Sequence, residues 1–471
     1  MSQGLLVNLV LMVGVVAFAL LTCLAPSMAV VAGMASIVFA ATVRWPDYVP
    51  KWGFYAIVGL VPLSAIGGHL PIPVVNSLTK LMFLLAFGWL LIGGILGNRR
   101  FVVGPQGLAA MAFAGTSVLA YIYCEKTEAT FPVLMRFLNH VLLFLLAVNV
   151  LKTKRDIAIL FGVIVITCLV SAVGGILSPN LWSHEHGTAG ERLAGWTLQD
   201  DAPTFGFFLL MGILISFYYL LVTRLAWLRV ALLPVIGILV YAMVSTYARS
   251  TFIVLVAAVG FTLFKLRKRI PVVFALLCLC VITLAVAPLI PRAFYSRITS
   301  IGRQFDSEGR RDPTVQWRID SARIGFDMFM QSPLMGRGPG NFPEEYLSRE
   351  FRYDRAYRPK SVVGNTYVSV LYQVGFLGFA ILTLLMFMAW RDLRAVKASY
   401  TVEGAGVWPP AFLNDAAILL QILLVALLMF SLFGAIEKEK YLWAVLATAA
   451  VLARIRREEL PPAISAKPVE G

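Results

Sequence analysis

The chain has 471 residues, of which 59% are hydrophobic and 14% are charged, and its formal net charge is +15. A soluble domain cannot bury this much apolar surface, so the composition argues against a soluble protein and places most of the chain in lipid. The five cysteines lie in or beside apolar runs without a CxxC spacing, which argues against a disulfide framework and a cysteine-rich metal centre.

Apolar runs separated by polar segments predict an all-α, polytopic transmembrane bundle of about 12–14 spans. The first run has no basic residue before it, unlike a cleaved signal peptide, and is therefore counted as a span. The runs lie at residues 5–24, 28–43, 52–66, 78–97, 107–124, 131–150, 157–177, 202–222, 226–245, 250–264, 270–290, 365–390, 413–434 and 440–453.

Basic residues lie at every second boundary between these runs. They are Arg44/Lys51, Arg99/Arg100, Lys152/Lys154/Arg155, Arg224/Arg229, Lys265/Arg267/Lys268/Arg269, Arg391/Arg394/Lys397 and Arg454/Arg456/Arg457. Because cytoplasmic loops carry the excess of Lys and Arg, this pattern places both termini in the cytoplasm. About half of the basic residues then serve as topological anchors, and the positive charge requires no nucleic-acid partner.

The same pattern divides the chain into four parts. Residues 1–290 hold the first eleven transmembrane helices, and residues 291–364 form a large loop outside the cytoplasm. Residues 365–453 hold the C-terminal helices, and residues 454–471 form a cytoplasmic tail. The loop contains twelve Arg and one Lys against nine acids. Guanidinium groups suit phosphates and carboxylates, so an anionic ligand is favoured over a solvated, salt-bridged loop or contact with anionic lipid headgroups.

An amphipathic helix is predicted within this loop. Asp312-Pro313 is typical of a helix start and Ser332-Pro333 of a stop. Between them, apolar residues recur at helical spacing, which predicts a helix that lies along the outer membrane surface or covers a cavity. These residues are Val315, Ile319, Ala322, Phe326 and Phe329. The glycine-rich segment 336–342 either directs backbone N–H groups at an anion or forms a tight turn, and the turn is favoured.

Two arginines lie near the outer membrane boundary without a topological reason. Arg249 is in the short turn 245–250, and Arg192 is in the outer segment 178–201. A charge held near the bilayer is costly and indicates function, with a snorkelling arginine as the alternative. Together with the arginine-rich loop, the two side chains predict an electropositive pocket for a pyrophosphate-linked lipid that carries a glycan.

Histidines give weaker signals. His184 and His186 are two residues apart, but no third ligand accompanies them, so loop histidines are favoured over a metal site and no metal is expected. Arg136, Asn139 and His140 share a face of the run 131–150. They either form polar contacts between helices or face the same cavity.

Four stretches, in this order, resemble the O-antigen ligase and O-antigen polymerase superfamily of bacterial envelopes. They are Glu191-Arg192-Leu193-Ala194-Gly195 through Asp200-Asp201-Ala202-Pro203-Thr204; residues 245–250; residues 318–329 with the following Ser332-Pro333-Leu334-Met335-Gly336-Arg337-Gly338-Pro339-Gly340-Asn341-Phe342; and residues 364–378. The resemblance covers roughly residues 190–380. Two positions depart from it, because Gly364 replaces the histidine of the outer loop and Gln373 replaces the following glutamate.

The resemblance implies a glycosyltransferase of the bacterial inner membrane that uses a glycan on undecaprenyl pyrophosphate and needs no cofactor or metal. Arg192 and Arg249 are the expected catalytic residues, which would neutralise the leaving pyrophosphate. The expected substrate-binding residues are Arg318, Arg323, Arg337 and Asn365. The base is open, and its candidates are Glu344, Glu345, His186 and Asp200.

A polymerase of O-antigen or exopolysaccharide repeat units is the favoured function, because the superfamily's ligases use the histidine that Gly364 replaces. A ligase that transfers the glycan to lipid A–core or protein is the alternative. A lipid-glycan transporter is the alternative of another class, but it predicts charges within spans, whereas most charges here lie at span ends. The expected partners are the lipid-linked glycan, membrane lipids and other glycan-assembly proteins.

Overall fold

The computed structural model describes residues 49–63, 86–88, 101–125, 127–178, 182–183, 192–193, 195, 202–267, 277, 280, 313–348, 363–399 and 411–459. The expected spans at 5–24 and 28–43 lie outside the described residues, as do nearly all residues of those at 78–97 and 270–290.

Eight helices of the described part are long and apolar enough to cross a membrane, which confirms the predicted all-α polytopic bundle. They are α6 (Gly104–Tyr123), α7 (Thr130–Val150), α8 (Lys154–Leu177), α9 (Ala202–Val222), α10 (Ala226–Ser245), α11 (Arg249–Leu266), α16 (Thr366–Ser399) and α17 (Ala411–Phe430). The helix α18 (Lys440–Glu459) is equally long but ends in charged turns. Each predicted run from 107–124 to 250–264, and from 365–390 to 440–453, corresponds to one of these helices.

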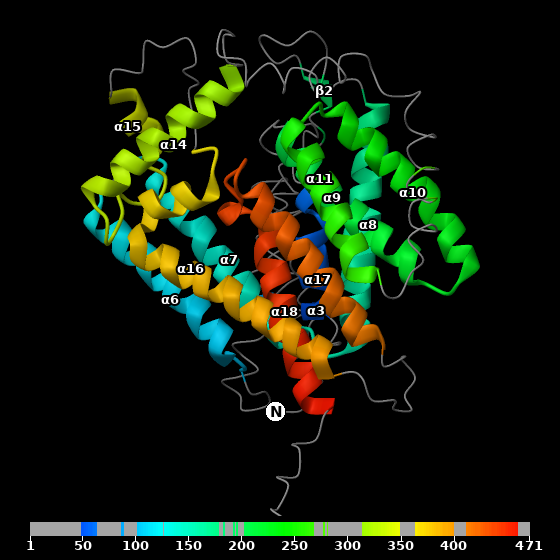
Figure 1. Ribbon diagram of the computed structural model, residues 1–471. Coiled ribbons are helices and arrows are strands. Elements are labelled where there is room, and N and C mark those ends of the chain that lie inside the picture. Colours follow the sequence, from blue (N-terminus) through cyan, green and yellow to red (C-terminus); the bar gives the residue numbers. More distant parts are fainter. Residues whose placement is uncertain are drawn as a thin grey trace, which may run out of the picture.

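Shorter elements gather at one end of the bundle (Figure 1). This end, where α7, α9, α11, α16 and α18 begin, is called the outer end because the sequence predicts that it faces away from the cytoplasm. Here lie β1 (Trp182–Ser183), β2 (Arg192–Leu193), α14 (Pro313–Gln331), α15 (Phe342–Ser348) and η5 (Ile436–Lys438). The strands pair antiparallel, with Ser183 opposite Arg192. The remaining short elements are α3 (Val49–Gly59) and η1 (Val61–Leu63).

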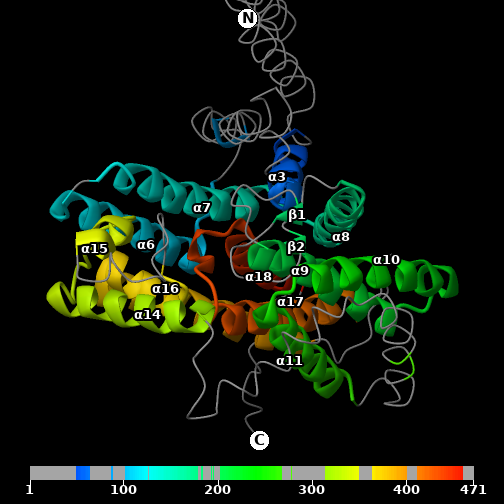
Figure 2. The same ribbon diagram turned by 90° about the horizontal axis from the view of Figure 1, so that it is seen from above.

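The centre of the bundle is formed by α9, α17 and α18. The helix α9 is apolar on all sides and buried along almost its whole length, between α8, α10, α11 and α17. In the view from above, α14 and α16 lie on one side of α18, and α10 and α11 lie toward the other (Figure 2). Apolar residues on the peripheral helices, such as Trp227 and Val230 of α10, are exposed, as is expected of a bundle surface in lipid.

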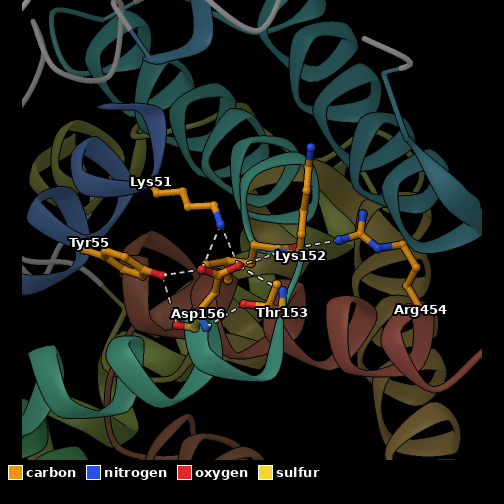
Figure 3. Close-up of polar contacts among 7 residues, drawn as sticks. Lys51, Tyr55, Lys152, Thr153, Asp156 and Arg454 are labelled. Carbon is orange, nitrogen blue, oxygen red and sulfur yellow. Dashed lines mark hydrogen bonds and ion pairs between the residues drawn. The ribbon is translucent and has the colours of Figure 1, made fainter. Parts of the chain in front are cut away.

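A polar cluster holds the opposite end of the bundle together (Figure 3). The Nζ atom of Lys51 on α3 lies 2.9 Å from both carboxylate oxygens of Asp156. Tyr55 donates to the Asp156 backbone carbonyl at 3.1 Å. Asp156 and Thr153 form a capping box at the start of α8, which satisfies backbone N–H groups that a helix start leaves unpaired.

The C-terminal helix joins the same end. Arg454 of α18 donates to the backbone carbonyls of Val148 and Leu151, where α7 ends. The predicted basic segments at Lys51, residues 152–155 and residues 454–457 therefore meet at one end of the bundle, as their alternation along the chain predicts. Which side of the membrane this end faces stays a prediction.

The helix α14 begins and ends where the sequence predicts, and it packs on α16. Ile324 and Met328 are buried in this contact. In contrast, Ile319 and Phe326 of the predicted apolar stripe are 45% and 48% exposed. The helix therefore packs on α16 through a different face from the stripe that the spacing picked out.

The helix α16 is interrupted at Gly375, whose φ of 68° and ψ of −174° are not helical. This combination is open almost only to glycine. A short segment, residues 366–374, therefore precedes the long transmembrane segment that begins at Phe376 and ends at Ser399. The break places the short segment beside α14 and the 431–439 connection between α17 and α18.

Candidate functional site

Arg192 is held against the turn that carries Arg249. Its side chain is 6% exposed, and its Nε donates to the Thr246 carbonyl at 3.0 Å. Thr246 follows α10 directly, and Arg249 is the first residue of α11. The structure therefore brings Arg192 to the turn between α10 and α11, which the sequence alone places more than 50 residues away.

The turn itself has a tightly defined shape. Tyr247 has a φ of 52°, a left-handed conformation that is uncommon for a residue with a side chain. Thr246 Oγ1 donates to the Met243 carbonyl at 2.7 Å, and the turn packs closely on α9, where a Cβ at Gly206 would lie 3.1 Å from Thr246. The half-buried Arg249 therefore starts α11 from a rigid base.

The Arg192 side chain thus lies at the turn whose last residues begin α11, and Arg249 is the first residue of that helix. A helix N-terminus carries a partial positive charge and unpaired N–H groups, so it adds to the field of the arginines. Such an arrangement favours a bound anion and stabilises negative charge that develops during a reaction.

The glycine-rich segment forms a tight turn rather than an anion cradle. The N–H of Arg337 donates to the Tyr372 carbonyl at 2.6 Å, and the N–H of Gly338 donates to the Gln373 carbonyl at 3.1 Å. The N–H of Gly340 donates to Oε1 of Gln373 at 3.3 Å. These N–H groups are used by the break in α16, and the turn interpretation is therefore confirmed.

Asn341 fixes the end of this segment to the loop between α6 and α7. Its side chain is 6% exposed, and its Oδ1 accepts from Thr130 at 2.7 Å and from Thr127 at 3.1 Å. Its Nδ2 donates to the Glu125 and Arg337 carbonyls at 2.8 and 2.7 Å. The segment thus ties α7 to α16 at the outer end.

The expected substrate-binding residues have different surroundings. Arg318 donates through Nη1 to the Phe433 carbonyl at 2.7 Å, which joins α14 to the 431–439 connection. Asn365 caps α16, because its Oδ1 accepts from the N–H groups of Tyr367 and Val368. Arg323 is exposed and Arg337 is half-buried.

The candidates for the base are only partly described. Glu344 is exposed on α15. His186 and Asp200 lie outside the described residues, as does the neighbouring His184, and the side chain of Glu345 is not described. The assignment of these residues stays a prediction.

A buried carboxylate that sequence reasoning missed lies between α17 and α18. Glu437 is 0% exposed, and its Oε1 accepts from Ser369 at 2.7 Å and from Gln373 at 3.3 Å. Lys438 Nζ lies 3.8 Å from the same oxygen. The sequence offered one signal, a run of alternating charges at residues 437–440 that interrupts two apolar runs at the outer end.

Further contacts hold the backbone of Glu437 and its neighbours. Trp443 donates to the Glu437 backbone carbonyl at 3.0 Å, and the ring of His140 on α7 stacks on Trp443 with 6.3 Å between ring centroids. Burial lowers the pKa of the Lys438 ammonium from its usual value, and Glu437 opposes this shift. His140 is itself 5% exposed, so the face of α7 that carries it packs on α18.

The described residues contain no group of three or more His, Cys, Asp or Glu side chains placed to hold a metal ion. The expectation of a metal-independent reaction stays a prediction.

Residues 234–383 match a protein-family model described as O-antigen ligase. Comparison with curated proteins finds no match. The matched region begins within α10 and ends in the long segment of α16, so it includes Arg249, the glycine-rich segment and Gln373. In the sequence, Arg192 precedes the matched region and Glu437 follows it. In the structure, both lie at the outer end of the bundle.

Proposed function

We propose that the protein polymerises glycan repeat units, and the match of residues 234–383 to the O-antigen ligase family model supports this proposal. The donor is an oligosaccharide on undecaprenyl pyrophosphate, and the reaction takes place at the outer end of the bundle, facing the periplasm. The observation that carries the proposal is the contact of Arg192 with the turn that presents Arg249.

The chemistry needs a stabilised leaving group. The bond between the anomeric carbon of the donor sugar and the pyrophosphate oxygen breaks, and its electron pair stays on the pyrophosphate. A hydroxyl oxygen of the acceptor glycan forms the new bond to the anomeric carbon. Arg192, Arg249 and the N-terminus of α11 stabilise the charge that builds up on the leaving group, in the way of preorganised cations.

The helix α14 completes the site in this proposal. Arg323, which is exposed on α14, and Arg337, at the glycine-rich segment, contact the anionic or polar groups of the substrate. Arg318 and Asn365 border the same region and hold α14 and α16 against the 431–439 connection. Their contribution to binding in this proposal is through the position of α14 and α16.

The test uses cells that make the glycan and mass spectrometry of their lipid-linked intermediates. Arg192→Ala and Arg249→Ala should each reduce long polymer at least 100-fold while single repeats accumulate on the lipid, because one preorganised donor contributes about 10²–10³-fold to such reactions. Arg229→Ala is the matched control, because Arg229 also donates through Nε to a backbone carbonyl, that of Thr223, but at the opposite end of α10.

Full polymer output from Arg249→Ala, at normal protein levels, would show that this pocket is not the site. An equal loss in Arg229→Ala would show that the effect is on folding rather than on the reaction.

A ligase is the second candidate, favoured by the description of the matching family. It acts on the finished glycan, so loss of the gene should leave long lipid-linked chains rather than single repeats. The same mass spectra therefore distinguish the two activities.

A further inference from the structure

Glu437 presents an unusual electrostatic problem. It is fully buried, yet only its Oε1 has hydrogen-bond partners, while Oε2 has none within the described part of the chain. An unsatisfied buried carboxylate oxygen is costly, and native structures contain few of them. Such a group calls for a function or a ligand.

The surroundings hold one oxygen in place and leave the other for a ligand. Ser369 and Gln373, both from the short segment of α16, donate to Oε1. Gln373 is itself held by the N–H of Gly340, and Thr366 fixes the connection by donating to the Gly434 carbonyl at 2.6 Å. The short segment of α16 and the 431–439 connection therefore set the orientation of the Glu437 carboxylate.

The position suits a group that acts on the acceptor. The 431–439 connection lies between α14 and α16 on one side and the end of α11 that carries Arg249 on the other (Figures 1 and 2). Phe433 of this connection contacts Arg318, and Phe430 at the end of α17 stacks on Phe207 of α9 with 4.5 Å between ring centroids. Glu437 thus lies at the outer end of the bundle, where α11 and its first residue Arg249 also begin.

We propose that Oε2 of Glu437 accepts the proton of the attacking hydroxyl of the glycan acceptor. The O–H bond of the acceptor breaks as its oxygen bonds to the anomeric carbon, and the proton passes to Oε2. The electron pair of the broken sugar–phosphate bond leaves with the pyrophosphate at the arginine pair. This inference rests on the proposed glycan transfer and supplies the base that the sequence left open.

The acceptor must reach a covered atom. The side chain of Lys438 is 10% exposed, whereas that of Glu437 is 0% exposed, so Lys438 is the more open side of the pair. In the proposal the acceptor displaces Lys438, whose Nζ lies 3.8 Å from Oε1, and passes this more open side to reach Oε2. Lys438→Gln should therefore change the apparent affinity for the acceptor more than the maximal rate.

The experiment uses the full-length protein in lipid nanodiscs with a prenyl-diphosphate-linked repeat unit as both donor and acceptor. Glu437→Gln should lower kcat by about 100-fold or more, in the range of general-base contributions, with little change in KM. Glu437→Asp should restore part of the rate, since it keeps the carboxylate. Glu458→Gln is the control, because Glu458 pairs with Arg454 at the opposite end of α18.

The pH dependence separates proton transfer from a structural role. The wild-type rate should depend on pH, and this dependence should be absent from Glu437→Gln. The charged group in contact with Glu437 is Lys438, on which Arg136 of α7 and Glu439 also act. The contacts from α16 are the uncharged Ser369 and Gln373.

Each outcome decides one point. A Glu437→Gln protein with wild-type rate and pH profile would overturn the assignment of Glu437 and leave the proposed function intact. A protein that melts far below wild type and loses rate at every pH in parallel would also overturn it, in favour of a structural role. A wild-type protein without transfer activity would overturn the proposed function and this inference with it.

Discussion

Replacing Gly375 by alanine tests whether the break in α16 is essential to the fold. The backbone conformation at this residue costs a residue with a side chain on the order of 1–3 kcal/mol. A Cβ would also overlap the Leu334 carbonyl. Three backbone hydrogen bonds depend on this geometry, from Arg337, Gly338 and Phe376 to carbonyls across the break, and each contributes about 1 kcal/mol. We expect Gly375→Ala to destabilise the protein by about 4–6 kcal/mol.

Two assays are used. In the first, the purified protein in detergent is heated and the remaining folded fraction is measured by size-exclusion chromatography. In the second, glycan output is measured in cells. Gly237→Ala is the matched control, because a Cβ at Gly237 in α10 meets no atom within 4 Å, and alanine favours a helix over glycine. Gly375→Ala should unfold well below wild type and lose output, whereas Gly237→Ala should match or exceed wild type. Equal stability of the two variants would refute the reasoning.

Three further predictions concern polar contacts at the two ends of the bundle. Asp156→Ala should lower stability by roughly 2 kcal/mol, through loss of the α8 cap and of a partly exposed ion pair, and unchanged thermal unfolding would contradict this. Asn341→Ala removes four hydrogen bonds and should cost roughly 3 kcal/mol, visible as faster proteolysis near the glycine-rich segment; unaltered cleavage would argue against its role. Arg454→Met, which keeps length but no donors, should cost about 2 kcal/mol in unfolding assays, and a smaller loss than in Arg457→Met would contradict the assignment.

Among the described residues, hydropathy predicts the spans from 107–124 onward well, because a helix in lipid must be apolar over its whole length whatever its neighbours. The predicted span 52–66 instead contains the short α3 and η1. The bounds of α14 were also predictable from Asp312-Pro313 and Ser332-Pro333. Its packing face was not, since an apolar side chain near lipid does not need to be buried in protein. Ile319 and Phe326 belong to the stripe that the sequence assigns to the membrane surface or to a cavity, and they are about half exposed rather than packed on α16.

The candidate site was predicted only in part. Arg192 and Arg249 were selected because arginines near a bilayer are costly, and the structure brings the side chain of the first to the turn that carries the second. Glu437 was not selected, because its burial depends on Ser369 and Gln373, more than 60 residues earlier in the chain. A local sequence pattern cannot predict a contact between residues so far apart in the chain.

The bond from Arg454 to Val148 has a consequence for biosynthesis. The two residues are 306 positions apart. At about 5–20 residues per second, the ribosome delivers Arg454 roughly 15–60 s after Val148. Until then the last carbonyls of α7 lack this donor, so α7 enters the membrane before its C-terminal carbonyls have their hydrogen-bond partner. A chain that stalls before residue 454 would therefore leave the carbonyls of Val148 and Leu151 without the Arg454 donor.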